Sequence, residues 1–485
     1  MQAHRRKQLG AYYTPDAAVA ALVRWAVHHT RDRLLDPSAG DGRFLALHKR
    51  SVGVETDPIS AVTARARAPW ALVHEGDFFQ WAEGTKERFE CAAGNPPFIR
   101  YQRFSGKERD RALRLCARLG AEFSSLTSSW APFLVAAASL LKPEGRLAFV
   151  VPAEIGHAPY AAPLIRFLLA RFADVRLLAV REKVFSELSE DVWLLYADGF
   201  GNRGQGITFA MADQFEYMET PPLTGRFVTS DELEQWNFRL RPFLLPAEIL
   251  TLYRDLSSRP TTVRLGEVAR VGIGYVTGAN DFFHLRPTIA KQLRIPDSML
   301  RVSVRNGRML PSTAVTQGTV KKWLATDEPC LLLNLPTNVN LPDRVRRYLD
   351  SEEGKSARST YKCRMRDPWY SVPDVTVPHA FLAYMSGGSP GLVANRARCV
   401  GTNSVHTVHL TTPADLSVLQ VAWSRPLTTL SCELEGHPLG GGMLKIEPRE
   451  AQRVAMSFAA RVDKKGDERL MEGLHTMRAW RHCHG

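Results

Sequence analysis

The stretch RLLDPSAGDGRF, residues 33–44, decides the fold. Arg33 to Asp36 is a short run, mostly apolar, that ends in an acid, which is typical of a strand. A turn with Gly40 and Gly42 follows, and residues 44–48 predict the start of a helix. Glycine lets backbone N–H groups approach a ligand, and a helix N-terminus favours negative charge. The stretch therefore predicts a strand, a ligand-contacting turn and a helix.

Strand-like and helix-like segments alternate over the first 200 residues. Apolar runs predict strands at 52–55, 71–74, 89–93, 146–151, 175–180 and 192–197, and helical spacing predicts helices at 16–30, 130–141 and 163–173. Such alternation is typical of a parallel, doubly wound sheet. We therefore predict an α/β domain with a Rossmann-like fold.

Polar residues stand where four of these strands end, namely Asp36, Glu55, Asp77 and Asn95. Ligands of such sheets bind beyond the carboxyl ends of the strands, where an acid at the second strand can accept hydrogen bonds from both hydroxyls of a ribose. Asp77 can accept a hydrogen bond from an adenine amino group, with Phe78 against the ring. Taken singly, each acid is better explained as a solvated strand end or a helix cap. Three in register favour a nucleoside site.

Neither of two phosphate-binding motifs follows the first predicted strand. GxxxxGK[ST], which would indicate a nucleoside triphosphate, does not occur, and the single GxGxxG match, at 199–204, lies in a turn-rich break rather than at the start of a predicted helix, as a dinucleotide site requires. This favours an adenosine ligand without a phosphate chain, and S-adenosylmethionine is the natural candidate.

Chain length and a change in the sequence pattern predict two domains. A chain of 485 residues exceeds a typical single core. After about residue 200 the pattern becomes irregular, with short strands and many Pro and Gly, and a turn-rich break occurs at 199–206. We place the boundary so that the domains are 1–240 and 241–485, the second with a mixed α+β fold.

The charge and the cysteines suggest the environment. Lys+Arg 63 against Asp+Glu 50 gives a net charge of +13, which fits a polyanionic partner or serves solubility. Seven unpaired Cys and no CxxC indicate reduced thiols and no metal site. The first residues lack an apolar signal core, and the longest apolar run, 130–141, is too short to span a bilayer. We expect a cytoplasmic protein without a membrane segment.

The motifs in their order resemble a known family. LGAYYTP (9–15), LLDPSAGDGRFL (34–45), VGVETDP (52–58), GDFF (76–79) and GNPPF (94–98) are similar to the gamma-type N6-adenine DNA methyltransferases of bacterial restriction–modification and phage-defence systems. SLLKPEGRLAFVVPAEI (139–155) and VFSELSEDVWLLYAD (184–198) extend the match through the first 200 residues. Patches at 271–283, 391–408 and 439–456 resemble the DNA-recognition domain of that family.

This resemblance implies a role for each motif residue. Thr14 and Tyr13 would hold the amino-acid end of S-adenosylmethionine, and Glu55 its ribose. The methionine portion and the adenine would be lined by Asp36, Ser38, Gly40, Gly42, Asp77, Phe78 and Pro97. Asn95, Pro96 and Phe98 would form the catalytic set, and Phe185 would stack on the target base opposite Phe98. The family often has Tyr in place of Phe98, so the ring is kept and the hydroxyl is lost.

The expected chemistry explains the NPP sequence. The lone pair of adenine N6 is delocalised into the ring, so methyl transfer requires the nitrogen to become pyramidal. The Asn95 side-chain oxygen and the Pro96 carbonyl can each accept one N6–H, more strongly in the transition state than in the ground state. Proline fixes φ and removes competing N–H donors. The base must leave the duplex, and Phe98 and Phe185 would replace its lost stacking.

A basic run follows the NPPF motif. Seven cations and two acids between residues 100 and 118 give a net charge of +5. Contact with DNA phosphates is one interpretation, and a solvated helix face is the other. The candidate DNA-binding residues are Arg100, Arg103, Lys107, Arg109, Arg111 and Arg114.

We therefore predict a site-specific adenine-N6 DNA methyltransferase that uses S-adenosylmethionine. Its partners would be double-stranded DNA and cognate restriction or defence subunits, and we expect a monomer. Two alternatives stay open: a methyltransferase acting on RNA or on a protein glutamine, and a catalytically silent DNA-binding subunit.

Overall fold

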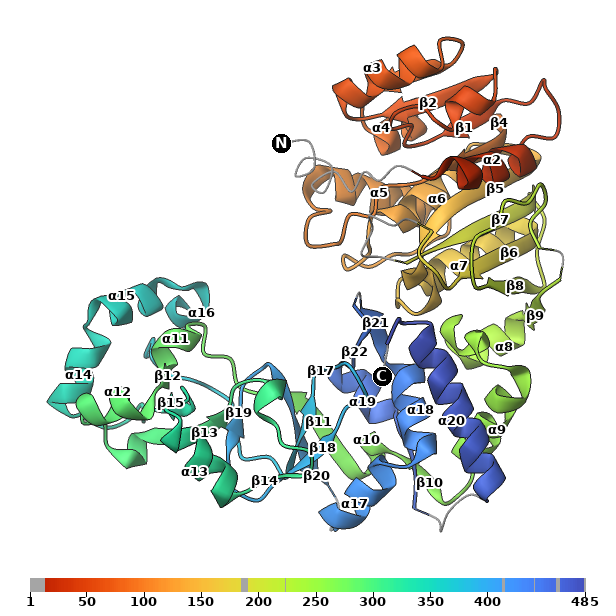
Figure 1. Ribbon diagram of the computed structural model, residues 1–485. Helices are drawn as coiled ribbons and strands as arrows, with labels where there is room; N and C mark the ends of the chain where they lie inside the picture. The colour runs from red at the N-terminus through yellow and green to blue at the C-terminus, as the bar shows by residue number, and fades with distance from the viewer. Residues whose placement is uncertain are drawn as a thin grey trace. The chain divides into compact units, whose positions relative to one another are not determined.

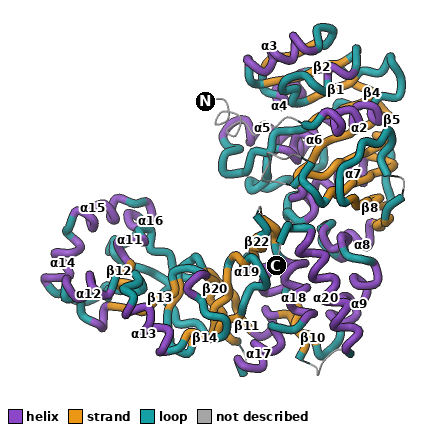
Figure 2. The backbone as a smooth tube through the Cα atoms, viewed as in Figure 1, coloured by secondary structure: helices purple, strands orange, loops and turns teal. Residues whose placement is uncertain are grey.

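The computed structural model describes residues 14–184, 191–222, 224–411, 415–439, 441–458 and 463–483. The chain divides into two compact units, Met1–Leu244 and Leu245–Gly485 (Figure 1). The sequence placed this boundary after residue 240. Figure 2 shows helices and strands alternating in the first unit and smaller groups of strands in the second.

Among its described residues, the first unit contains a nine-stranded sheet in the order β3-β2-β1-β4-β5-β7-β6-β8-β9. The strands are β1 (Leu34–Asp36), β2 (Ser51–Glu55), β3 (Leu72–Glu75), β4 (Phe89–Gly94), β5 (Leu141–Pro152), β6 (Phe172–Val180), β7 (Val192–Phe200), β8 (Gly206–Ala212) and β9 (Arg226–Thr229). β3, β2, β1, β4 and β5 run parallel, and β7 is antiparallel to both of its neighbours. The order reverses between β1 and β4, where open α/β sheets bind their ligands.

Helices cover the sheet of the first unit. They are α2 (Asp16–Ala26), α3 (Pro58–Arg67), α4 (Phe78–Gly84), α5 (Gly106–Arg118), α6 (Trp130–Ser139), α7 (Ala161–Arg171) and α8 (Ser230–Gln235). α2 packs against β4 and β5, and α3 packs against β2 and β3. α6 contacts α4, α5 and α7. All residues from Leu147 to Pro152 of β5 are buried, as expected of a strand with both faces covered.

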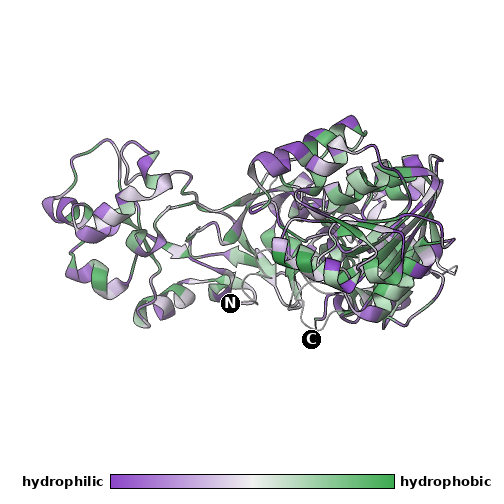
Figure 3. Ribbon diagram, turned by 90° about the horizontal axis from the view of Figure 1, so that it is seen from above, coloured by the Kyte–Doolittle hydropathy of each residue, from purple (hydrophilic) through white to green (hydrophobic). Residues whose placement is uncertain are grey.

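Local sequence explains where these helices begin. Asp57 caps α3 by accepting a hydrogen bond from Ser60 N, and Pro58 occupies the first turn, where its missing N–H costs nothing. Asp77 caps α4 in the same way through Gln80 N, at 2.7 Å. The helices in Figure 3 alternate between green and purple along their turns, which is the pattern of helices with one buried face.

The second unit combines several small sheets with helices. Its five-stranded sheet has the order β11 (Ala269–Ile273), β20 (Val405–Leu410), β16 (Ala380–Ala383), β18 (Leu392–Asn395) and β14 (Ala314–Val315). A second sheet has the order β12 (His284–Leu285), β15 (Leu331–Leu333), β13 (Leu300–Val304) and β19 (Val400–Gly401). Smaller pairings join β17 (Met385–Ser386), β22 (Met443–Lys445) and β21 (His437–Leu439), and β10 (Thr262–Arg264) with β23 (Ala455–Ser457).

The helices of the second unit fall into two groups in Figure 1. α9 (Ala247–Ser257), α18 (Pro426–Glu435) and α20 (Lys464–Ala479) pack together. α11 (Asn280–Phe283), α14 (Asp343–Leu349), α15 (Glu352–Ser359) and α16 (Tyr361–Arg364) lie around another core, which contains Phe282, Phe283 and Cys363. The remaining helices are α10 (Leu265–Val268), α12 (Pro287–Gln292), α13 (Gln317–Ala325), α17 (Leu416–Trp423) and α19 (Pro448–Arg453).

The predicted fold class is confirmed, and some boundaries differ. The segment 44–48 contains only a 3₁₀ turn, Leu45–Leu47, because His48 returns to extended backbone. The helix expected at 16–30 ends at Ala26, and the strand expected at 146–151 begins at Leu141. Within the part of the chain that the structure describes, no helix is both long enough and apolar enough to cross a membrane.

Candidate active site

The turn after β1 joins the ends of three strands. Ser38 N donates to Asp36 Oδ1 at 3.1 Å, and Ser38 Oγ donates to the carbonyl of Asn95 at 3.0 Å. Gly40 N donates to Glu55 Oε2 at 2.8 Å. The turn therefore links the carboxyl end of β1 to that of β2 on one side and to the NPPF segment after β4 on the other.

Two glycines of this turn have positive φ. Gly40 has φ +54° and Gly42 φ +81°, a backbone region that residues with a Cβ rarely adopt. A Cβ on Gly42 would also lie 2.7 Å from Ala64 Cα, in α3. Gly42 is therefore required for close packing of the turn on the helix, while the Gly40 N–H faces Glu55.

Asp36 is a fully buried acid at the switch point. Burial, helped by the nearby Glu55 carboxylate, raises the pKa of Asp36 to about 8, although the Ser38 N–H acts in the opposite direction. Its Oδ2 is buried and accepts no hydrogen bond within the described part of the chain. A buried carboxyl oxygen without a hydrogen-bond partner is costly unless a ligand supplies one. The atom is a candidate acceptor for a cationic or hydrogen-bonding ligand.

Glu55 is held in place by backbone donors. Its Oε1 accepts from Asp57 N at 2.7 Å, and its Oε2 accepts from Gly40 N. Burial raises the pKa of Glu55, and these N–H groups partly offset that rise. Each carboxylate oxygen keeps a second lone pair, so Glu55 can still accept hydrogen bonds from a diol.

Gly94 allows β4 to pass beside Asp36. A Cβ at Gly94 would lie 2.7 Å from Asp36 Oδ1 and 3.3 Å from Phe149 Cε1. Because no side chain fits there, glycine brings the start of the NPPF segment against the carboxyl group. The NPPF sequence indicates roles for the amide and the prolines. The need for glycine at position 94 follows from the close approach of Asp36, which only the structure shows.

Two serine hydroxyls hold the NPPF segment on either side of Pro96. Ser38 binds the Asn95 carbonyl, and Ser129 Oγ donates to the Pro97 carbonyl. Ser129 Oγ also accepts from Ile99 N at 3.0 Å, and Ser129 N donates to the Ile99 carbonyl at 3.0 Å. None of the described residues donates a hydrogen bond to the carbonyl of Pro96 itself.

The side chains of the motif sit at the edge of the core. Pro96 is buried, and Asn95 and Phe98 are half-buried. The Asn95 side-chain oxygen is buried, and the Phe98 ring packs against the apolar cluster that contains Leu22 and Phe44. One part of Phe98 is therefore fixed by packing while the rest of the ring stays accessible.

Thr14 is tied to the glycine turn. Thr14 is buried, and its carbonyl accepts a hydrogen bond from Arg43. Arg43 also donates from Nε and Nη2 to Asp41, at 3.0 and 2.9 Å. Tyr13 and Phe185, to which the resemblance also assigned roles, lie outside the described residues.

Asp77 and Phe78 have structural partners. Asp77 Oδ1 caps α4 and also accepts from Arg111 Nη1 at 3.2 Å. The Phe78 ring is 3% exposed and stacks on Phe133, with ring centroids 5.3 Å apart. Gly76 N donates to the Glu55 carbonyl at 2.9 Å, so the β3–α4 turn still adjoins the site. Asp77 therefore lines a groove beside the ends of β2 and β3, together with Val54 and Gly76, while Phe78 packs inside the protein.

The basic run divides into paired and exposed cations. Arg111 contacts Asp77 and, at 3.6 Å, Glu83, while Arg109 lies 3.7 Å from Asp110. The exposed members that form no ion pair with any described residue are Arg103, Lys107 and Arg114. Arg100 is also exposed. The side chains of the run that face solvent are therefore these exposed ones, whereas Arg111 is engaged with Asp77, the residue that caps α4.

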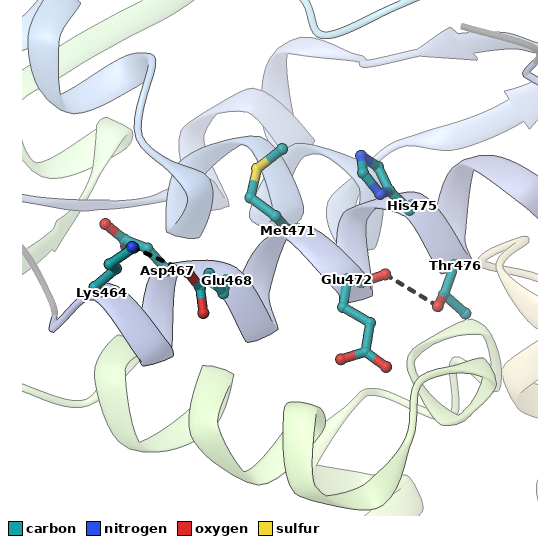
Figure 4. A pocket seen from close by; sticks show the side chains of 7 residues that line it. All are labelled: Lys464, Asp467, Glu468, Met471, Glu472, His475 and Thr476. Atoms are coloured by element: carbon teal, nitrogen blue, oxygen red, sulfur yellow. Dashed lines mark hydrogen bonds and ion pairs between the residues drawn. The ribbon is translucent and has the colours of Figure 1, made fainter.

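A groove in the second unit does not have the features of a reaction site. Its lining side chains all come from α20, among them Asp467, Glu468, Glu472 and His475 (Figure 4). No other element contributes a polar group, and the structure contains no cluster of three or more metal-binding side chains within its described ranges. The switch point of the first unit remains the candidate active site.

Family models match most of the chain. Residues 239–481 match the model described as type II methyltransferase M.Eco57I, C-terminal domain, and residues 60–185 match the Eco57I restriction-modification methylase. The type II methyltransferase M.XamI of Xanthomonas campestris pv. amaranthicola is 25% identical over 481 residues, 93% of this chain and 85% of its own. M.AccI of Acinetobacter calcoaceticus is 17% identical over 489 residues, with coverages of 96% and 88%.

A solved structure shares the fold. The DrdV–DNA complex aligns with a TM-score of 0.53 at 11% identity, over 97% of this chain and 57% of that chain. This chain therefore spans little more than half the length of that protein. At so low an identity the likeness concerns the fold alone.

Proposed function

The chain belongs to the family of the type II methyltransferase M.Eco57I, and we propose that it methylates N6 of adenine in duplex DNA with S-adenosylmethionine as the donor. It is a DNA methyltransferase of the restriction–modification type. The proposal for adenine N6 rests on one observation above all. At the switch point, Ser38 and Ser129 donate hydrogen bonds to the carbonyls of Asn95 and Pro97, on either side of Pro96. The Pro96 carbonyl itself has no donor among the described residues.

The strand ends suit S-adenosylmethionine. The buried Oδ2 of Asp36 lacks a donor in the described chain and would accept one from the cationic methionine portion, beside Ser38, Gly40 and Gly42. Glu55 would hold the ribose with its remaining lone pairs, and Thr14 and Tyr13 the amino-acid end. Asp77, Phe78 and Pro97 would border the adenine, although Phe78 does so from a packed position. When bound, the cofactor supplies an electrophilic methyl group on a sulfonium.

Asn95 and Pro96 would act on the target amine. The Asn95 Oδ1 and the Pro96 carbonyl each accept one N6–H, which favours a pyramidal nitrogen with its lone pair free to react. Because Ser38 and Ser129 hold the backbone on both sides of Pro96, its carbonyl need not reorganise as the nitrogen changes geometry. Positioning supplies most of the acceleration, and the proton leaves afterwards to water.

The target base must leave the duplex to reach this loop. Phe98, half-buried beside the loop, would stack on one face of the extruded adenine, and Phe185 on the other. Each aromatic face restores about 1–3 kcal/mol of stacking. Exposed Arg103, Lys107 and Arg114 would contact the phosphates of the DNA.

Modified-base detection tests the proposal. The protein is expressed in a host without its own DNA methylation, and the genome is read by long-read sequencing that distinguishes modified bases. The expected result is N6-methyladenine within one short sequence motif, and none in cells that express Asn95→Ala at equal level. Methylated cytosine, or adenine methylation that survives in Asn95→Ala, would refute the assigned chemistry. An unmodified genome with soluble protein would favour the catalytically silent alternative.

A further inference from the structure

The second unit presents a highly exposed apolar pair at α16. Tyr361 is 65% exposed and Met365 70%, the two highest values for large hydrophobic side chains among the described residues. Tyr361 begins α16 (Tyr361–Arg364), and Met365 directly follows it, four residues further along the chain. Exposing such a pair to water is unfavourable, so a partner that covers it would gain apolar contact.

The helix that carries this pair is firmly held from below. Cys363 is buried, and its Sγ lies 3.6 Å from the Thr277 carbonyl. Arg366 donates to the carbonyls of Thr277 and Val276, at 2.7 and 2.6 Å. Gly278 has φ +87°, and a Cβ there would lie 2.6 Å from Lys362 Cβ, so the turn at 276–278 packs tightly under α16. The exposed side chains therefore stand on a rigid support.

The surroundings of the pair are strongly basic. Residues 358–366 contain four cations, Arg358, Lys362, Arg364 and Arg366, and no acid. Arg366 is engaged with backbone carbonyls, whereas the other three are exposed. None of these three forms an ion pair with a residue that the structure describes. These three cations, which have apolar side chains between them, could pair with the charges of a polyanion. A polyanion with an apolar interior would also suit the apolar side chains.

We propose that Arg358, Tyr361, Lys362, Arg364 and Met365, here called the α16 surface, contact duplex DNA. This inference rests on the proposed function and adds to it a specific site of DNA contact in the second unit. Lys362 and Arg364 neutralise phosphates, and Tyr361 and Met365 enter a groove and contact base edges or sugars. Phosphate contacts fix the position on the duplex, and groove contacts carry the sequence preference.

Charge distinguishes DNA from a second copy of the chain. Two α16 surfaces facing each other would bring six exposed cations together without a carboxylate between them, which disfavours such a dimer. Each phosphate neutralised by a Lys or Arg releases a bound counterion instead, which favours binding. Duplex DNA therefore fits both features of the surface, the cations and the apolar pair.

Two double variants test the two halves of the surface. Binding is measured by fluorescence anisotropy with a mixed-sequence 40-base-pair duplex between 50 and 300 mM salt. Lys362→Ala with Arg364→Ala should weaken binding about tenfold at 0.1 M salt and reduce the slope of log K against log salt by about 2. Tyr361→Ala with Met365→Ala should weaken binding about fivefold or more and leave the slope unchanged.

The control removes two exposed cations elsewhere in the second unit. Lys464→Ala with Lys465→Ala changes the charge equally, on α20 beside Asp467 and Glu468, and should leave affinity and slope nearly as in the wild type. Wild-type affinity and slope in both α16 variants would overturn the proposal. Loss of self-association in Tyr361→Ala with Met365→Ala, seen by sedimentation with DNA binding unchanged, would assign the surface to a second copy and also overturn it.

The same samples separate this proposal from the proposed function. Methyl transfer to plasmid DNA is measured for the wild type alongside the binding experiments. If the wild type methylates adenine while both α16 variants bind like it, the α16 proposal alone fails. If the wild type methylates no DNA, the proposed function fails, and the binding results still decide whether the α16 surface contacts DNA.

Discussion

Replacing Ser129 by alanine should slow methyl transfer while leaving cofactor affinity nearly unchanged. Ser129 is fully buried, and its hydroxyl serves two backbone groups of the motif loop, the Pro97 carbonyl and the Ile99 N–H. Without the hydroxyl both groups lose their partner, at a cost of about 1–3 kcal/mol in the free energy of unfolding. The bond from Ser129 N to the Ile99 carbonyl remains, so the loop should shift rather than unfold.

A shift of this loop moves the Pro96 carbonyl and the Asn95 amide together. Misplacement by about 1 Å can cost about a hundredfold in rate, so we expect kcat to fall by about ten- to a hundredfold. The KM for S-adenosylmethionine should change little, because Asp36 and Glu55 keep their own hydrogen bonds.

A matched control exists at the other end of α6, the helix that Ser129 precedes. Ser139→Ala removes a hydroxyl whose one hydrogen bond among the described residues is to the Ala136 carbonyl of α6. Single-turnover transfer of tritiated methyl to DNA gives the rate, urea unfolding gives the stability, and calorimetry gives cofactor affinity. If Ser129→Ala transferred methyl groups as fast as Ser139→Ala, the positioning role of Ser129 would be wrong.

Three further variants probe the site and its surroundings. Burial raises the pKa of Asp36 to about 8, so between pH 4 and 8 its carboxyl group stays protonated in the folded state and is ionised in the unfolded state. The free energy of unfolding should therefore fall by up to about 1.4 kcal/mol for each pH unit gained in this window. In Asp36→Asn, urea titrations should show a free energy of unfolding that varies less with pH. Gly94→Ala places a Cβ against the Asp36 carboxyl and should lower the unfolding free energy by about 1–3 kcal/mol, which a thermal melt measures; an unchanged melting temperature would contradict the close contact. Neutralising Arg103, Lys107 and Arg114 together should reduce the salt slope of DNA binding by about 3, and an unchanged slope would leave the basic run as a solvated surface.

The fold of the first unit could be predicted from sequence because its signals are local. Apolar runs ending in Asp36, Glu55 and Asn95 mark parallel strands, and the strand order then places their carboxyl ends at one edge. The pairing of β1 with both β2 and β4 is the geometry that such runs need in order to share a site. The positions of these three residues follow from that pattern.

Other features depend on contacts between distant residues and could not be predicted in this way. Ser129 lies 32 residues from the Pro97 carbonyl that it binds, and a serine before a helix carries no signal for that role. The basic run around Arg111 suggested contact with phosphates. In the structure α5 packs on α4, and Arg111 forms an ion pair with Asp77 instead. Phe78 likewise packs on Phe133 because α6 covers it.

The central claim is that Asn95 and Pro96 direct a methyl group to N6 of adenine in DNA. The most direct test incubates the purified protein with duplex DNA and S-adenosylmethionine carrying a deuterated methyl group, digests the DNA to nucleosides and identifies the labelled product by mass spectrometry. The account predicts labelled N6-methyldeoxyadenosine from the wild type and none from Asn95→Ala, which should still bind the cofactor. Label on cytosine, or equal label on adenine from Asn95→Ala, would contradict it.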